Sequence, residues 1–198
     1  MSKKKSIKKK LKLKKMKGIV ILKNHGYVLM NQINHFQLIM IFHLENFEPK
    51  TTHAIHIHEF GDTSDGCTSL GGHYNPEKKD HGHLGTSNRH KGDLFNNFTT
   101  DDNGNFYYEF MEYDIHINDL FGRSIVIHYL QDDEGFQKYH ETPYYLLSDK
   151  LLVKLCDERG YQNLHSRKEY IDKLNKESLI TGNAGKRLVC GIIARKKN

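Results

Sequence analysis

The chain lacks any long apolar run, and only three of its 198 residues are cysteine. Leu11, Leu13 and Met16 lie scattered among lysines, so the N-terminal region cannot supply the apolar centre of a secretory signal. No later span reaches the length of a membrane-crossing helix. We therefore predict an intracellular protein, cytoplasmic or nuclear, whose thiols are expected on compartment alone to stay reduced.

Residues 1–17 also lack acidic side chains, and they contain ten lysines. The remainder of the chain has 20 basic and 24 acidic residues. We predict a solvated, disordered arm over residues 1–16, followed by one domain over residues 17–198. The alternatives for such an arm are contact with nucleic acid or an anionic membrane surface, and a nuclear address. A strand-like stretch begins at Met16, so translation that starts there is a further alternative.

Short runs of β-branched and aromatic residues recur along the chain, separated by turn residues such as Asp101–Gly104. Regular short strands with no helix between most of them indicate an antiparallel sandwich or barrel. Eight strands are predicted, at Gly18–Leu22, Tyr27–Asn31, Phe36–Phe42, His53–His58, Leu94–Thr100, Phe106–Met111, Ser124–Tyr129 and Leu188–Ala194.

Two long connections interrupt this rhythm. The first, residues 59–92, is too rich in glycine for a helix, and loops of this length in a compact domain commonly form a functional site. The second, residues 130–181, contains two helix-like segments. One begins at the capping-box sequence Ser166–Glu169, and the other is capped by Ser148 or Asp149. We predict that the two form an inserted helical hairpin within residues 136–178.

Histidine is the residue type that indicates a functional site in this sequence. His56 and His58 are two residues apart in a predicted strand, so both side chains lie on one face of it. Imidazole is a ligand for copper and zinc, and three imidazoles with one carboxylate complete a tetrahedral zinc set. Seven residues have the order and spacing of a paired metal site: His56, His58, His73, His81, His90, Asp93 and His128.

These residues lie in motifs that resemble those of the copper/zinc superoxide dismutase family. The resemblance extends from about Lys17 to the C terminus. Only the lysine arm and much of the second long connection lie outside it. It implies an all-β, eight-stranded antiparallel Greek-key barrel with an immunoglobulin-like arrangement. The motifs are His56–Asp62, Gly66–Ser69, His73–Pro76, Arg89–Leu94 and Thr181–Gly191.

Carried over residue by residue, the resemblance implies two metal ions joined by a bridging histidine, His73. The sequence supports the division between the metals, because His56, His58 and His128 belong to strands, which hold them rigidly, while the zinc residues come from one loop that the ion would organise. His83 lies two residues from His81, but the family's spacing favours His81. The implied ligands are His56, His58, His73 and His128 for copper, and His73, His81, His90 and Asp93 for zinc.

The implied reaction converts superoxide to dioxygen and hydrogen peroxide, with copper alternating between two oxidation states and zinc in a structural and electrostatic role. His73 would exchange a proton during the cycle, and the permanently charged Arg187 would attract and orient the anion. Asp132 matches the acid that accepts a hydrogen bond from one ligand of each metal. Cys67 and Cys190 correspond to the family's disulfide within one subunit.

The chain departs from the family before Thr181. Lys176, Glu177 and Ile180 lie where two acids and a lysine usually help to guide the anion. Cys156 has no counterpart and is expected as a buried thiol on the inserted helix. Family members are commonly dimers, so a homodimer through Phe60–Asp62 and the C-terminal strand is expected. Delivery of copper by a chaperone is left open. The bias toward Asn, Lys and Ile and the enlarged loop suggest an origin in a large DNA virus or another AT-rich genome.

Other functions are compatible with parts of this pattern. A copper/zinc-binding module on the same fold, without efficient turnover, is the main alternative. Loss of a copper ligand or of Arg187 would favour it, and neither is missing. A zinc hydrolase needs an open zinc position, whereas the implied zinc has four protein ligands. A nucleic-acid-binding role depends on the lysine arm alone.

Overall fold

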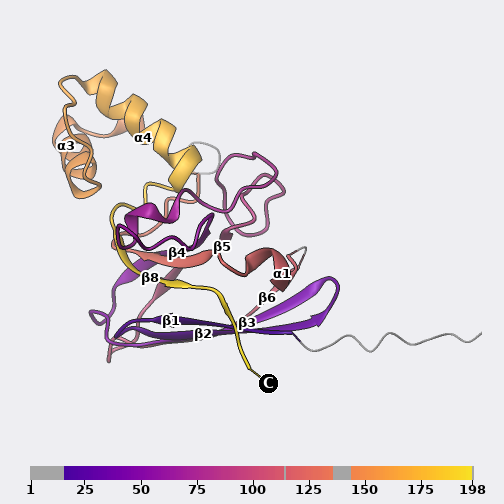
Figure 1. The fold of residues 1–198 in the computed structure, drawn as a ribbon. Coiled ribbons are helices and arrows are strands. Elements are labelled where there is room, and N and C mark those ends of the chain that lie inside the picture. The colour runs from indigo at the N-terminus through magenta and orange to yellow at the C-terminus, as the bar shows by residue number, and fades with distance from the viewer. Residues whose placement is uncertain (1–15, 114, 136–143, 198) are drawn as a thin grey trace, which may run out of the picture.

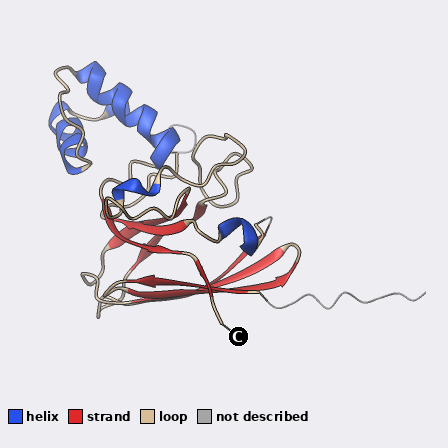
Figure 2. Ribbon diagram, in the orientation of Figure 1, coloured by secondary structure: helices blue, strands red, loops and turns tan. Residues whose placement is uncertain are grey.

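The computed structural model describes residues 16–113, 115–135 and 144–197. The predicted arm, apart from Met16, lies outside the described residues. Two antiparallel sheets face each other, and two helices lie above one end of the sandwich (Figure 1). Colouring by secondary structure separates this β layer from the helical part of the chain (Figure 2). The predicted all-β antiparallel architecture is confirmed.

The first sheet has five strands in the order β6-β3-β2-β1-β9. Residues of β3 alternate strictly between buried and partly exposed, as expected for a strand with one face on the core. A tight turn joins β1 to β2, and Asn24 and Gly26 both have positive φ there. The strands are β1 (Lys17–Leu22), β2 (Gly26–Asn34), β3 (Gln37–Leu44), β6 (Phe106–Tyr113) and β9 (Ala194–Arg195).

The second sheet has four strands in the order β5-β4-β7-β8. All five residues of β7 and six of the seven in β4 are buried. Both faces of this sheet are therefore covered, one by the first sheet and the other by loops. The strands are β4 (Thr52–His58), β5 (Asp93–Thr99), β7 (Ser124–His128) and β8 (Arg187–Ile192).

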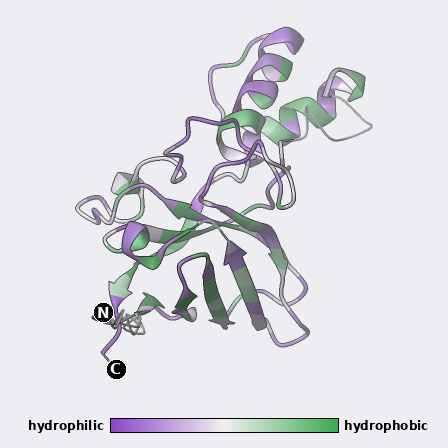
Figure 3. Cartoon of the chain, turned by 90° about the vertical axis from the view of Figure 1, so that its right-hand side faces the viewer, coloured by the Kyte–Doolittle hydropathy of each residue, from purple (hydrophilic) through white to green (hydrophobic). Residues whose placement is uncertain are grey.

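The main core lies between the two sheets. Hydrophobic residues are concentrated in the strands, whereas the connecting loops are mostly hydrophilic (Figure 3). Met40 of the first sheet and Ile57 and Ile127 of the second are fully buried in this core. Burial of each such side chain contributes about 2 kcal/mol to folding. The core thus fixes β4 and β7, the strands that carry three of the predicted ligands.

Two details differ from the sequence prediction. The last predicted strand is divided, because β8 ends at Ile192 and β9 begins at Ala194 in the other sheet. The chain changes sheets at the buried Ile193, whose backbone bonds Arg123 and Gly122 in the loop before β7. A short helix, α1 (Ile117–Leu120), was also not predicted. At four residues it is too short to leave a periodic pattern.

The predicted helical hairpin is present. Ser148 caps α3 (Asp149–Glu158), and Ser166 caps α4 (Arg167–Thr181). Glu169 completes the second cap, because its carboxylate accepts a hydrogen bond from the backbone N–H of His165. The helix α4 ends at Gly182, which has a left-handed conformation. In the described part of the chain, no helix has the length and apolar character needed to cross a membrane.

A second, smaller core holds the two helices together. Leu152 and Cys156 of α3 pack against Leu174 of α4 and against Tyr144, which belongs to a short 3₁₀ helix, η2 (Tyr144–Leu146). The buried thiol of Cys156 confirms its predicted place on the inserted helix. A further 3₁₀ helix, η1 (Thr68–Leu70), lies in the long loop after β4. The insert therefore has its own hydrophobic contacts and meets the barrel mainly through polar groups.

Candidate metal centre

Neighbouring strands bring three histidines to one place. In the antiparallel pair β4 and β7, His56 is opposite Val126 and His58 is opposite Ser124. His128 is the last residue of β7, and its Nε2 lies 3.3 Å from Nε2 of His58. The even spacing of His56 and His58 places both rings on the same side of the sheet. All three side chains are buried.

His73 reaches the same place from the long loop after β4. A single antiparallel bridge joins its backbone to His58, and its ring stacks on that of His56 with centroids 3.9 Å apart. Nδ1 of His56 and Nε2 of His73 are buried without a hydrogen-bond partner among the described residues. Donor atoms within 4.8 Å of one another come from His56, His58, His73 and His128.

A second cluster gathers around one carboxylate oxygen. Oδ1 of Asp93 lies 2.9 Å from Nδ1 of His73, 3.0 Å from Nδ1 of His81 and 3.2 Å from Nδ1 of His90. The Nδ1 atoms of His73 and His90 are 3.4 Å apart. Zinc with ligands at about 2.0–2.1 Å in a tetrahedron separates its donor atoms by about 3.3 Å. The four donors therefore have the spacing of a tetrahedral zinc set.

The ring nitrogens that already have a hydrogen-bond partner decide which residues belong to the second cluster. Grouping by distance alone joins His56 to His73, His81 and Asp93. However, Nε2 of His56 is hydrogen-bonded to Asp132 at 2.6 Å, which leaves only its Nδ1 for a metal. His90 has its Nδ1 within 3.4 Å of both His73 and Asp93. We therefore place His90 in the second cluster and His56 in the first.

Five of the six rings offer one nitrogen to a metal, and their other nitrogen is held by a hydrogen bond to an oxygen. Such anchoring fixes the orientation and the tautomer of a ligating imidazole. His73 alone has no oxygen anchor outside the two clusters: its Nδ1 belongs to the second and its Nε2 to the first. The anchors are Asp132 for His56 and His81, the Gly71 carbonyl for His58, the Lys79 carbonyl for His90 and the Gly185 carbonyl for His128.

Asp132 lies between the two clusters and contacts a ring from each. Its Oδ2 accepts from Nε2 of His56 at 2.6 Å, and its Oδ1 accepts from Nε2 of His81 at 2.8 Å. Asn96 donates to the same carboxylate at 3.0 Å. A side chain at position 182 would collide with Asp132 and His81, so the glycine that ends α4 is required by close packing as well as by its φ of 62°.

Burial and neighbouring charge set the protonation of these rings. Burial lowers the pKa of His73 and of His128 to about 3, so both are neutral at pH 7 and keep a lone pair for a metal. Burial also acts against protonation of His81, but Asp132 and Asp93 outweigh it and raise its pKa to about 10. The carboxyl of Asp132 has a pKa far below its usual range, because its contacts with His81 and His56 overcome burial. Metal binding at His81 must therefore displace a proton.

Arg187 lies beside the first cluster, at the start of β8. Its guanidinium donates to the carbonyls of Cys67 and Gly71, both at 2.5 Å. The Gly71 carbonyl also accepts from Nδ1 of His58 at 3.0 Å. The charge of Arg187 is close enough to lower the pKa of His58 and of His128. The guanidinium is thus a fixed, half-exposed cation next to the histidines of the first cluster.

A disulfide fixes the loop that holds Arg187. Cys67 is bonded to Cys190 across a separation of 123 residues, so the predicted pairing is present. The bond ties the loop after β4 to β8 itself. A bridge that closes a loop of this length stabilises a fold by about 5 kcal/mol on the chain-entropy model. Because the Cys67 carbonyl accepts from Arg187, the disulfide also stabilises the position of that cation.

The insert reaches the second cluster through its helix α4. The backbone N–H of His81 donates to the carbonyl of Leu179, and that of Asp133 donates to the carbonyl of Gly182, both at 2.8 Å. The carboxylate of Asp133 accepts from Ser178 at 2.9 Å and from Asn183 at 2.6 Å. Sequence reasoning missed the roles of Asp133 and Asn96. Neither has a spacing signal, although Asp133 directly follows the predicted Asp132.

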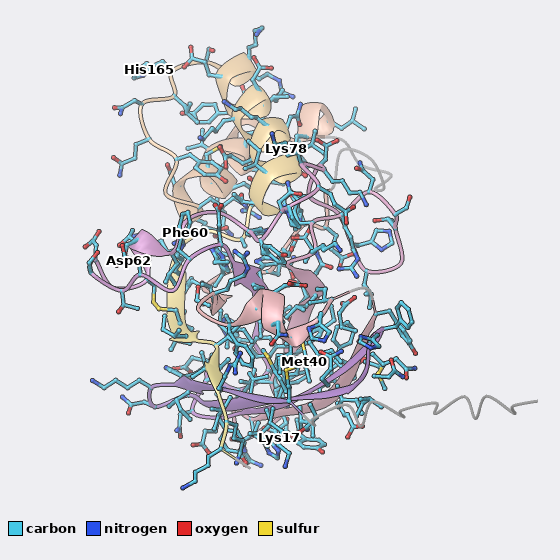
Figure 4. The ribbon with its side chains drawn as sticks, turned by 45° about the vertical axis from the view of Figure 1, so that its right-hand side comes forward. Lys17, Met40, Phe60, Asp62, Lys78 and His165 are labelled. Carbon is cyan, nitrogen blue, oxygen red and sulfur yellow. A yellow bond between two sulfur atoms is a disulfide. The ribbon has the colours of Figure 1, made fainter. Side chains whose placement is uncertain are left out.

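Among the described residues, no other histidine joins either cluster. His53 is buried, but its Nδ1–H donates to the carbonyl of His128 at 3.0 Å and so positions that strand end. Nδ1 of His83 is 2.6 Å from the carbonyl of Leu84 in its own loop. His165 lies at the far tip of the helical insert (Figure 4). The sequence interpretation preferred His81 to His83 as a ligand, and His83 lies outside the second cluster.

The chain is similar to several known proteins over most of its length. The sequence profile described as "Copper/zinc superoxide dismutase (SODC)" matches residues 24–144. A "Superoxide dismutase [Cu-Zn]" of Cryptococcus neoformans is 32% identical over 90% of this chain and 97% of its own length. A protein of the same description from Schizosaccharomyces pombe is 34% identical over 85% and 88%. Among solved structures, the "clock protein EA4" matches with a TM-score of 0.66 and 28% identity, over 90% of this chain and 93% of that one.

Proposed function

The chain belongs to the copper/zinc superoxide dismutase family, and we propose that it converts superoxide to dioxygen and hydrogen peroxide. One observation carries the proposal: His73 is the only ring of the two clusters that offers one nitrogen to each. Two clusters that share a ring in this way suit two different cations. A single structural metal would leave the first cluster, with its unpartnered buried nitrogens, without a purpose.

The first cluster fits copper and the second fits zinc. Four imidazole nitrogens, all neutral because burial lowers their pKa, form a donor set that copper prefers. Three imidazoles and a carboxylate, closed on all sides by protein, form a structural zinc set. The proposed copper residues are His56, His58, His73 and His128, and the proposed zinc residues are His73, His81, His90 and Asp93.

When bound, copper supplies the one-electron chemistry that two superoxide anions need in order to disproportionate. Within the protein, Nε2 of His73 is the atom that can hold and release a proton beside the reacting anion. Its other nitrogen is held in the zinc cluster, so the ring keeps its position while Nε2 changes state. Arg187 holds the anion beside His58 and His128 through its permanent charge.

The experiment that tests the proposal combines metal analysis with a dismutation assay on the same preparation. We expect about one copper and one zinc for each chain, and turnover that approaches the diffusional limit. Full metal content without turnover would favour the alternative, a copper/zinc-binding module. A preparation that binds zinc alone would contradict the proposed copper cluster.

The proposed partners are superoxide and a second copy of the chain. Phe60 and Asp62 project from the surface loop beside β8 (Figure 4), and Phe60 is 50% exposed. This loop and β8 form the surface that we propose for a homodimer. Sedimentation of the native protein and of Phe60→Glu tests this, because the variant should shift toward monomer. Cytoplasmic location, a copper chaperone, a viral source and a contact role for the lysine arm stay predictions.

A further inference from the structure

A recess of about 550 Å³ opens beside the first cluster and is lined by both the barrel and the insert. The loop after β4 and the start of β8 form its barrel side. The insert contributes one residue, the arginine that caps the C-terminal end of α3. The lining residues are Cys67, Thr68, Arg159, Gly185, Lys186 and Arg187.

The backbone behind this recess positions the histidines of the first cluster. The carbonyl of Gly185 accepts from Nδ1 of His128 at 3.2 Å. The carbonyl of Gly71 is shared between Nδ1 of His58 and the guanidinium of Arg187. A small anion that enters the recess therefore meets Arg187, which shares the Gly71 carbonyl with the ring of His58.

The recess is strongly cationic. Three of its lining residues are basic, and none of the described residues that line it is acidic. Among the described residues, Nη1 of Arg159 donates to the Leu155 carbonyl at 3.2 Å and its Nε is buried without a partner. Arg159 also lines two further recesses, which carry Asp133, Glu134 and Glu48. The carboxylate of its neighbour Glu158 instead lies 3.6 Å from Nζ of Lys154. The charge of Arg159 is thus not neutralised by an ion pair in the described part of the chain.

From this placement we propose that Arg159 is a second guiding cation, which draws small anions into the recess ahead of Arg187. As a claim about superoxide, this rests on the proposed function. The insert supplies this cation from the C-terminal cap of α3. A fixed positive charge at the mouth of a recess raises both anion affinity and association rate, and salt screens it.

The test compares Arg159→Gln with Arg159→Lys in the copper- and zinc-loaded protein. Lys154→Gln is the matched control, because Lys154 lies on the same helix, is exposed and is absent from the recess. Azide affinity is measured by optical titration of the bound copper at low and high salt, and kcat/KM for superoxide is measured over the same range. Metal content and the melting curve show that each variant is folded and loaded.

At low salt we expect Arg159→Gln to weaken azide binding and to lower kcat/KM, each about twofold, with a flatter dependence on salt. Arg159→Lys should stay near the native values, and Lys154→Gln should match the native protein. Equal behaviour of Arg159→Gln and Lys154→Gln would overturn the inference. An equal loss in Arg159→Lys and Arg159→Gln would overturn it too, because the role would then be structural. A native protein that binds azide in this Arg159-dependent way but lacks turnover would contradict the proposed function instead.

Discussion

The two halves of the proposed centre are held in different ways. His56, His58 and His128 belong to paired strands whose opposite side chains form the core. His73, His81 and His90 belong to a loop that has no strand of its own. Its supports include the backbone bridge from His73 to His58, Tyr74 in the main core, the disulfide at Cys67, the second cluster and the end of α4.

This contrast separates two requirements of a redox centre. The strand-held histidines need no metal to stay in place, because sheet pairing and burial fix them. The loop-held residues form a centre only when several weaker supports act together. Substitutions of the strand-held histidines should therefore abolish activity and leave the fold intact. Substitutions of the loop-held residues should lower stability and metal affinity.

The largest effect is expected from His128→Ala. Loss of this ring removes one proposed copper donor, while its backbone carbonyl still bonds His53. We expect dismutation to fall about 1,000-fold or more, with zinc content and melting temperature nearly unchanged. A matched change outside both clusters, His165→Ala at the tip of the insert, should have no effect. If His128→Ala retained activity within tenfold of native, the copper assignment would be wrong.

Removal of the disulfide by Cys190→Ser should act mainly on the loop. We expect a loss of about 5 kcal/mol in the free energy of unfolding, measured by denaturant titration. Activity should also fall, since the carbonyl that holds Arg187 belongs to Cys67. Reduction of the native protein should reproduce both effects. The buried Cys156 is the control thiol, and Cys156→Ala should not reduce activity.

Adjacent carboxylates allow a sharper comparison. Asp132→Asn alters the group that contacts His56 and His81, and we expect zinc affinity to fall about 10- to 100-fold, with a smaller effect on copper. Asp133→Asn alters the group that bonds Ser178 and Asn183, so it should loosen α4 and affect the metals less. Competitive chelator titration measures the affinities. Hydrogen exchange in α4 measures the docking. Unchanged zinc affinity in Asp132→Asn would contradict its linking role.

The smallest effect concerns the pH dependence of the metal-free protein. The pKa values of His56, His58, His73 and His128 are lowered by burial, so the unfolded chain takes up more protons at these sites as the pH falls below about 6.5. His81 acts in the opposite sense, because its pKa is raised. The four lowered pKa values together outweigh the raised pKa of His81. The free energy of unfolding of the metal-free protein should therefore fall by about 1 kcal/mol or more between pH 7 and 6. Bound metal should suppress this dependence, and a metal-free protein that is more stable at pH 6 would contradict the neutral clusters.

Much of the fold could be predicted from periodicity. Alternation and turn residues located eight strands, and caps at Ser148 and Ser166 located both long helices. Short elements could not be predicted, because α1 and β9 depend on tertiary contacts rather than on a pattern of their own. The sheet change at Ile193 is an example, since it follows from backbone bonds with the loop before β7.

The candidate site could be predicted where spacing and motif order carry information. The structure brings the seven predicted residues together in two adjoining clusters, with Asp132 between them and Arg187 beside them. Asn96, Asp133 and Arg159 could not be found in this way. Their importance comes from the tertiary fold: Asn96 has a positive φ in β5, Asp133 bonds Ser178 and Asn183 near the end of α4, and Arg159 caps α3. Such positions have no periodic or motif signal in a single sequence.

The central claim is that His73 lies between two different metals. Diffraction data from crystals of the loaded protein, collected on both sides of the copper and the zinc absorption edges, test it directly. We predict two anomalous peaks that flank one ring, copper at Nε2 and zinc at Nδ1 of His73. A single peak, or two peaks of which only one contacts His73, would contradict the shared ring.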